Sequence, residues 1–238
     1  MKTMLVLIGV TFVVVKLAVL ARSRVQLAPS HAIAFFFWPG MRPSTFAQRR
    51  ATNGVRERML RGIRNLAIGG VMLVGARLIA PYSIIAAIVI ALPALSLMLH
   101  FGVLTIATAA WRAAGFDAED LFRKPWRAQS LGEFWSRRWN IGFSDMMSVL
   151  VNRPIAARFG RNAGVMAAFL ASGLLHEIAI SIPARGGYGL PTLYFALHGA
   201  LVAAGVRGRI TMLVALLLPL PLCFHAPFLR AVIIPMLQ

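Results

Sequence analysis

An adjacent histidine and glutamate, His176 and Glu177, lie in the apolar segment SGLLHEIAI. A charged residue at the centre of a bilayer costs about 2.5 to 3.5 kcal/mol, so ionisable residues there usually face a bundle interior or a wet cavity. Burial favours the neutral imidazole, which can accept a proton from an alcohol. The pair therefore predicts a functional site within the membrane. A histidine that is merely hydrogen-bonded to a neighbouring helix is the alternative interpretation.

Helical spacing assigns these two side chains to different faces of one helix. Ser172 and His176 are four residues apart and share a face, whereas Glu177 is turned away by about 100°. A direct His176–Glu177 dyad is therefore not expected. A further histidine, His198 in the segment YFALHGALV, either lines the same cavity or packs against a neighbouring carbonyl group.

A second group of polar and aromatic residues forms the sequence SLGEFWSRRWNIGF, residues 130–143. Ser130, followed three residues later by Glu133, is a capping box and predicts that a helix begins there. On a continuous helix an aromatic stripe would form from Trp135, Trp139 and Phe143. Asn140 would lie in a polar row beside this stripe. An amphipathic anchor at the membrane surface is the simpler interpretation, and Asn140 would then be a solvated side chain.

The composition places both motifs in a membrane protein. Of the 238 residues, 59% are hydrophobic and 13% are charged, and the mean hydropathy is +0.75. Globular domains average about 45–50% apolar and about 25% charged residues. An ordinary soluble enzyme is thereby excluded. We expect an all-α fold, a polytopic transmembrane helix bundle that forms a single membrane domain over residues 1–238.

Long apolar runs predict six to eight membrane segments, since a span needs about 20 residues. The runs cover residues 3–20, 31–41, 65–80, 81–111, 163–182, 187–206 and 210–235. The first is interpreted as a membrane anchor, with a cleaved signal peptide as the alternative. The short second run is expected to be re-entrant or tilted. The last contains several prolines and predicts one span plus a broken helix.

The chain carries 25 Lys and Arg against 7 Asp and Glu, a net charge of +18. The basic residues are divided among the ends of the predicted spans, as the positive-inside rule produces, and they attract anionic lipid head groups. The lipid bilayer is therefore an expected partner and nucleic acid is not. Residues 42–64 and 112–161 hold most of these charges and are expected on the cytoplasmic side, together with an amphipathic helix at 130–143.

No metal or nucleotide-phosphate site is predicted. The single cysteine, Cys223, excludes an internal disulfide and sites built from several cysteines. The histidines lack the HExxH spacing of a helical zinc site, and neither GxGxxG nor GxxxxGK[ST] occurs.

The motifs FWSRRWN and SGLLHE together resemble the wax synthase branch of the membrane-bound O-acyltransferases, and WPGM at residues 38–41 is similar to an early motif of wax synthase-like proteins. The resemblance is densest over residues 130–200. It implies transfer of an acyl group from acyl-CoA to the hydroxyl of a lipophilic alcohol, with His176 and Asn140 at the family's histidine and asparagine positions. It implies acyl-CoA as a co-substrate and no other cofactor.

Under this resemblance His176 is the general base that removes the alcohol proton. Asn140 orients a reacting group or donates a hydrogen bond to the developing oxyanion. The other residues expected to bind substrate are Trp135, Trp139, Ser172, Glu177 and His198. Candidates to bind the acyl-CoA phosphates are Arg137, Arg138, Lys124 and Arg127. Ordinary positive-inside charges would explain these four residues equally.

Two rivals remain at this point. In a small transporter, His176, Glu177 and His198 would form a proton or ion path. An inactive relative could instead serve as a membrane scaffold. The aromatic segment around Asn140 favours the enzyme, because a proton path would not require it. The chain is shorter than most members of the family, which predicts that an N-terminal portion of the usual bundle is missing and that the tunnel is incomplete or completed in an oligomer.

Overall fold

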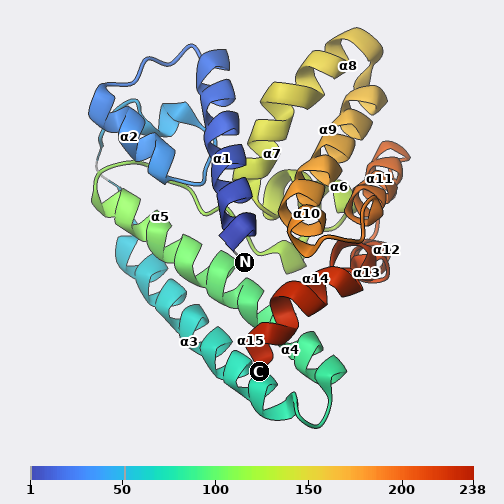
Figure 1. Cartoon of the computed structure of the whole chain (residues 1–238). Coiled ribbons are helices and arrows are strands. Elements are labelled where there is room, and N and C mark those ends of the chain that lie inside the picture. Colours follow the sequence, from blue (N-terminus) through green and yellow to red (C-terminus); the bar gives the residue numbers. More distant parts are fainter. Residues whose placement is uncertain (1, 51) are drawn as a thin grey trace. The chain divides into compact units, whose positions relative to one another are not determined.

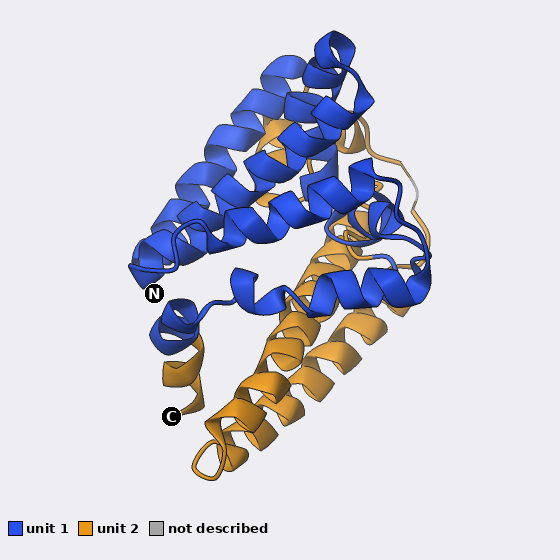
Figure 2. Cartoon of the chain, turned by 90° about the vertical axis from the view of Figure 1, so that its right-hand side faces the viewer, with its two compact units in different colours: residues 1–24, 123–232 blue, residues 25–122, 233–238 orange. Residues whose placement is uncertain are grey.

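The computed structural model describes residues 2–50 and 52–238 (Figure 1). Helices form almost all of the regular structure in these residues, and strand pairing is limited to one isolated bridge between Ser130 and Arg207. The expected all-α fold class is confirmed. By its internal contacts the chain divides into two compact units, Met1–Arg24 with Arg123–Val232, and Val25–Phe122 with Ile233–Gln238 (Figure 2). A single membrane domain stays a prediction.

The second unit is a helical hairpin with short helices at its ends. Its helical segments are α2 (Pro29–Phe37), η1 (Pro43–Phe46), α3 (Val55–Ile79), α4 (Ile84–Ser96), the π-helical η2 (Leu97–Val103), α5 (Leu104–Ala113) and α15 (Ile234–Leu237). The chain turns between α3 and α4 beside Pro81, as the sequence predicts. Helices α4, η2 and α5 continue one another and return along α3.

Small residues allow the two arms of this hairpin to approach closely. A β-carbon at Gly69 would lie 2.8 Å from the carbonyl oxygen of Ala94, and one at Gly62 would lie 3.1 Å from that of Gly102. The side-chain amide of Asn65 donates to the carbonyl of Phe101 at 3.0 Å, which adds a polar contact between the arms. Close packing of small residues and interhelical hydrogen bonds are the interactions that join helices in a bilayer.

The basic stretch 42–64 is helical from Val55 onward. Helix α3 begins at Val55, so four of the arginines predicted to precede the span lie on the spanning helix itself. Two of them pair with Asp120: Arg58 at 3.3 Å and Arg61 at 2.6 Å. The helix that contains most of the predicted span 65–80 therefore begins ten residues earlier, because paired and long basic side chains are tolerated at the end of a membrane helix.

The first unit contains α1 and all the motifs of the second half of the chain. After α1 (Lys2–Arg22) its segments are η3 (Pro125–Arg127), α6 (Leu131–Glu133), η4 (Phe134–Arg138), α7 (Ile141–Met147), η5 (Ser148–Asn152), α8 (Arg153–Phe159), α9 (Arg161–His176), η6 (Glu177–Ser181), α10 (Ile182–Ala184), α11 (Leu190–Ala203), α12 (Arg209–Leu217), α13 (Leu220–Cys223), α14 (Ala226–Phe228) and η7 (Leu229–Ile233). Of these, η4, η5, η6 and η7 are π-helical. Helices α9 and α11 pack against each other along their length.

The number of spanning helices is lower than expected. Within the described residues four helices are long and apolar enough to cross a membrane: Thr3–Arg22, Val55–Ile79, Ile84–Ala113 and Arg161–Ala184. A fifth span results if the pair Arg209–Cys223 and Ala226–Leu237, bent by 64°, is counted as one. Six to eight segments are not confirmed. Helix α11 has 14 residues and at 1.5 Å per residue extends only about 21 Å, short of a hydrocarbon core of about 30 Å.

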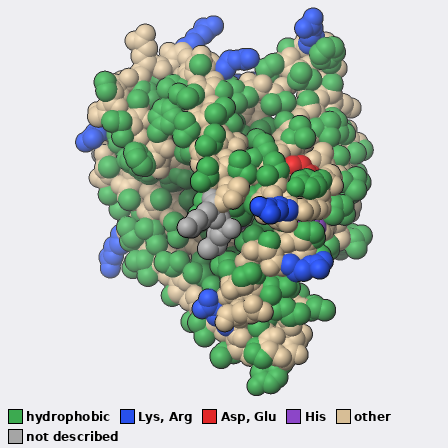
Figure 3. All heavy atoms as spheres, in the orientation of Figure 1, with side chains coloured by type: hydrophobic (Ala, Val, Ile, Leu, Met, Phe, Trp, Pro, Cys, Tyr) green, Lys and Arg blue, Asp and Glu red, His purple; other side chains and the backbone are tan. Residues whose placement is uncertain are grey.

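Exposed apolar side chains cover the outside of the spanning helices. Val71 and Leu78 on α3 are 74% and 69% exposed, and Leu5 and Val6 on α1 are 62% and 63% exposed. Figure 3 shows hydrophobic side chains over most of the visible face, with Lys and Arg scattered singly among them. Apolar surface of this extent is unusual for a soluble monomer, and lipid is the solvent that suits it.

The single helix predicted for residues 130–143 is wrong, although its start is correct. The Ser130 hydroxyl accepts a hydrogen bond from the Glu133 amide at 3.1 Å, as in a capping box. The helix then ends at Trp139, which is extended, and Asn140, which is left-handed with φ 44°. The aromatic side chains therefore do not form one helical stripe, because the backbone turns between Trp139 and α7.

Glu133 stabilises this turn through two partners. Its carboxylate accepts a hydrogen bond from the backbone N–H of Gln129 at 2.9 Å and forms an ion pair with Arg138 at 2.7 Å. Both interactions favour the charged carboxylate, and they lower the pKa of Glu133 below its ordinary value. In a capping box the Glu133 carboxylate would accept a hydrogen bond from the backbone N–H of Ser130. Here it accepts one from the preceding residue, Gln129.

The packing at Gly69 generates a stability prediction. Gly69→Ala places a methyl group against the α4 backbone and should lower the free energy of unfolding by about 1–3 kcal/mol. Gly70→Ala is the matched control, because a β-carbon there meets no atom within 4 Å, and it should leave stability unchanged or raise it by up to about 1 kcal/mol. Thermal unfolding of the two variants in detergent measures the difference; equal midpoints would contradict this account of the hairpin.

Candidate active site

His176 is the last residue of α9, and its ring is oriented by its own helix. Nδ1 lies 2.7 Å from the carbonyl oxygen of Ser172, one turn earlier. A carbonyl oxygen only accepts hydrogen bonds, so in the neutral ring Nδ1 carries the proton and Nε2 carries the lone pair. The predicted shared face of Ser172 and His176 is confirmed, and it supplies the hydrogen bond that fixes the tautomer.

Aromatic side chains from two other helices surround the imidazole. The ring centroid of Phe195, on α11, lies 4.3 Å from that of His176, and the ring of Phe143, on α7, lies 6.0 Å away and edge-on. Phe195 is in this position because α11 approaches α9 closely: a β-carbon at Gly173 would lie 2.6 Å from Cα of Thr192. The imidazole is thus held in an apolar environment by contacts from α7, α9 and α11.

Asn140 occupies the turn between η4 and α7 and caps the second helix. Its Oδ1 accepts a hydrogen bond from the backbone N–H of Phe143 at 3.2 Å. Asn is one of the few residues that adopts the left-handed conformation at small cost, because its short polar side chain bonds locally. The cap uses the amide oxygen, so the Nδ2 amino group is the part of the side chain that can donate to a ligand.

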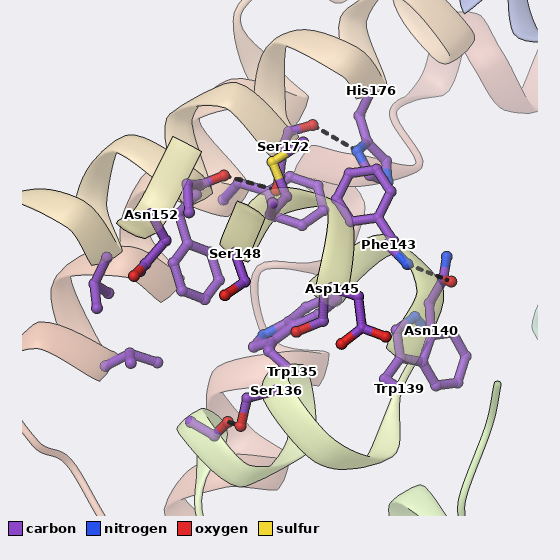
Figure 4. Close-up of a pocket in the computed structure, with 18 residues that line it drawn as sticks. Trp135, Ser136, Trp139, Asn140, Phe143, Asp145, Ser148, Asn152, Ser172 and His176 are labelled. Atoms are coloured by element: carbon purple, nitrogen blue, oxygen red, sulfur yellow. Dashed lines mark hydrogen bonds between the residues drawn. The ribbon is translucent and has the colours of Figure 1, made fainter. Parts of the chain in front are cut away.

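Asn140 and His176 both line one cavity of about 390 Å³ within the first unit. In Figure 4 the two side chains come from different elements, and Phe143 lies between them. Five aromatic side chains contribute to the cavity wall: Trp135, Trp139, Phe143, Phe169 and Phe195. Of the residues predicted to bind substrate, Trp135, Trp139 and Ser172 also line it.

Glu177 lies outside the cavity lining and holds the start of α11. Its Oε1 accepts hydrogen bonds from the backbone N–H of Gly189 at 3.1 Å, the backbone N–H of Thr192 at 3.0 Å and the hydroxyl of Thr192 at 2.9 Å. These donors belong to the first turn of α11, where backbone N–H groups lack helical partners. The structure places Glu177 as a residue that positions α11, and with it Phe195, beside His176.

His198 is fully buried behind the cavity wall. Its Nε2 lies 2.8 Å from the carbonyl oxygen of Ala215, to which it donates, and its ring lies 5.5 Å from that of Trp135. This geometry matches the packed histidine that the sequence left open as an alternative. His198 supports Trp135, which does line the cavity.

The basic residues considered for acyl-CoA binding do not line the cavity. Arg138 pairs with Glu133 and also donates to the carbonyl of Arg123 at 3.3 Å. Exposed positions are occupied by Arg137, Lys124 and Arg127. Within the described part of the chain, the cavity lining contains no Lys or Arg.

The sequence analysis missed a set of polar side chains on the cavity wall. These residues, called the polar row below, are Ser144, Asp145, Ser148 and Asn152. Ser144, Ser148 and Asn152 are spaced four residues apart along α7 and η5, a spacing that could have revealed a polar face. The row was overlooked because it lies within residues 112–161, a stretch interpreted from its charges as a cytoplasmic segment.

The segment that forms this site is similar to a known protein family. Residues 118–197 match the model of the membrane bound O-acyl transferase family. The matched segment contains Asn140, His176 and the whole polar row. The resemblance predicted from the two motifs is thus confirmed over this segment, and the match and the apolar helices together identify an integral membrane protein.

Several curated proteins are similar to part of the chain. A probable long-chain-alcohol O-fatty-acyltransferase 1 of Arabidopsis thaliana is 37% identical over 106 residues, 41% of this chain and 31% of its own length. A long-chain-alcohol O-fatty-acyltransferase of Simmondsia chinensis is 34% identical over 41% of this chain and 30% of its own length. The diacylglycerol O-acyltransferase 1 of Dictyostelium discoideum is 36% identical over 69 residues, 29% of this chain and 11% of its own length. The matches to the first two relatives thus span about a third of each relative's length.

The role of Glu177 can be tested by hydrogen exchange. Glu177→Ala removes three hydrogen bonds from the first turn of α11 and should speed amide exchange at Gly189 and Thr192 by at least about tenfold, the equivalent of 1.4 kcal/mol. Glu177→Gln keeps an amide oxygen that can accept the same bonds and should preserve most of the protection. Similar exchange in both variants and the wild type would show that the carboxylate does not hold α11.

Proposed function

We propose that this protein transfers an acyl group from acyl-CoA to the hydroxyl of a lipophilic alcohol and so forms an ester. The observation that carries the proposal is that His176, with a lone pair on Nε2, and Asn140, with a free amino group, line one aromatic cavity. The family match and relatives named as alcohol O-fatty-acyltransferases support this reaction class.

In the proposed reaction Nε2 of His176 accepts the proton of the acceptor hydroxyl while its oxygen attacks the thioester carbonyl. The imidazolium that forms keeps its Nδ1–H bond to the Ser172 carbonyl, which orients the ring and stabilises the charge. The amino group of Asn140 donates to the oxyanion of the tetrahedral intermediate. Collapse of this intermediate breaks the carbon–sulfur bond, and the coenzyme A thiolate takes the proton back from Nε2. The transfer is direct and needs no acyl-enzyme.

The surroundings suit this chemistry. Aromatic side chains on the wall of the cavity supply apolar surface for the acyl and alkyl chains, and bound chains that displace water would disfavour hydrolysis of the thioester. The proposal places the polar loops on the cytoplasmic side, where exposed Arg137, Lys124 and Arg127 can meet the phosphates of acyl-CoA. Acyl-CoA is the co-substrate, no further cofactor takes part, and the alcohol enters from the bilayer. Assembly into an oligomer is compatible with this scheme.

The general base is tested by replacing His176 with Ala in membranes supplied with palmitoyl-CoA and 1-hexadecanol. Loss of the base should lower the rate of ester formation by about 10²–10⁴. His31→Ala, at a histidine outside the cavity lining, is the matched control and should retain activity. Ester is quantified after lipid extraction, relative to the amount of folded protein. Ester formation by His176→Ala at the wild-type rate would disprove the assignment.

The donor role of Asn140 is separated from its capping role by Asn140→Asp. A carboxylate oxygen can cap α7 in the same way, but the amino donor is lost, so stability should stay within about 1 kcal/mol while the rate falls by about 10²–10³. Asn140→Gly preserves the left-handed backbone and removes both functions. If Asn140→Asp were fully active, Asn140 would be a structural residue only.

A further inference from the structure

The polar row forms a second, chemically distinct wall of the cavity. Ser144, Ser148 and Asn152 follow one another at intervals of four residues, so the row extends about 12 Å along α7 and η5. Figure 4 shows Asp145, Ser148 and Asn152 along the same cavity that His176 and Asn140 enter. A ligand with its reacting hydroxyl at His176 therefore lies beside this row.

Three members of the row have hydrogen-bonding capacity left over. The side chains of Ser144, Ser148 and Asn152 form no hydrogen bond with other described residues. Two other serines on the same wall differ: Ser136 donates to the carbonyl of Gly132 at 2.6 Å and Ser172 to that of Ala168 at 2.8 Å. Serines that bond to their own helix are satisfied without a ligand. The row is thus the part of the wall that gains hydrogen bonds when a polar ligand binds.

The lining favours an uncharged ligand. Among the described residues it has no Lys or Arg, although the whole chain has 25 of them. A phosphate group of acyl-CoA would therefore meet no cation there. Serine hydroxyl groups and an asparagine amide can both donate to and accept from the hydroxyl groups of an uncharged ligand.

From these features we infer that the acceptor carries at least one hydroxyl group besides the one that is acylated, as in a long-chain 1,2-diol or a glycerol-type lipid. This inference rests on the proposed function. A long-chain alcohol with a single hydroxyl leaves only hydrocarbon beside Ser144, Ser148 and Asn152, and covering polar groups without giving them partners is costly. A site built to bond a substrate hydroxyl rejects the analogue that lacks it.

The test compares 1,2-hexadecanediol with 1-hexadecanol as acceptors for palmitoyl-CoA. Wild-type protein in proteoliposomes should use the diol with a kcat/KM at least about tenfold higher. Ser148→Ala and Asn152→Ala, alone or together, should bring this ratio towards one. The matched control is Ser30→Ala/Asn162→Ala, two exposed residues outside the cavity, which should keep the wild-type ratio. The ratio is measured within each preparation and does not depend on the fraction of folded protein.

Each outcome separates the inference from the function on which it rests. Equal use of the two acceptors by the wild type, with ester formed from both, would overturn the inference and leave the acyltransferase proposal standing. A rise in the KM for palmitoyl-CoA in the row variants, with an unchanged acceptor ratio, would assign the row to the donor and also overturn it. Ester from neither acceptor, with no greater thermal stabilisation by the diol than by 1-hexadecanol, would refute both.

Discussion

The site depends on the close contact between α9 and α11. Gly173 lets the backbone at Thr192 approach to a distance that no side chain would permit, and Glu177, one turn later on the same face, binds the first turn of α11 through three hydrogen bonds. This face of α9 is therefore used for packing. The neighbouring face, with Ser172 and His176, is left to line the cavity, and Phe195 of α11 packs against the imidazole as a consequence.

The sequence could predict this division because it follows from helical geometry alone. Four-residue spacing separates Ser172 and His176 from Glu177 in any α-helix. What the sequence could not predict was the partner of Glu177, since the donors at Gly189 and Thr192 belong to a helix that begins after a turn. Glu177 was predicted to bind substrate because a charged residue in an apolar run needs a partner. The sequence does not show whether that partner is a substrate or another part of the chain. His198 was likewise predicted to bind substrate, and its partner in the structure is the Ala215 carbonyl.

Irregular helices account for most of the other differences between prediction and structure. Periodicity arguments assume 3.6 residues per turn, yet π-helical segments η4, η5 and η6 adjoin the cavity and change which residues share a face. The left-handed Asn140 then turns the chain between η4 and α7. Trp135, Trp139 and Phe143 reach one cavity by this turn and not by a helical stripe. Apolar runs also overstate the number of long spanning helices, because α11 has only 14 residues and the C-terminal pair is bent by 64° at a break.

Basic side chains are distributed over the surface of the chain and are absent from the described lining of the cavity. Exposed Arg and Lys act in water, where screening limits their reach to about 8 Å at physiological ionic strength, so they can attract head groups and phosphates at the surface without governing the cavity. The cavity lining, among the described residues, has no Lys or Arg, and it combines the polar row with aromatic side chains. Although the chain is strongly basic, the polarity of the cavity thus suits uncharged hydroxyl groups. The proposed reaction needs this separation, because the anionic end of acyl-CoA must remain outside while its thioester meets an acceptor hydroxyl at His176.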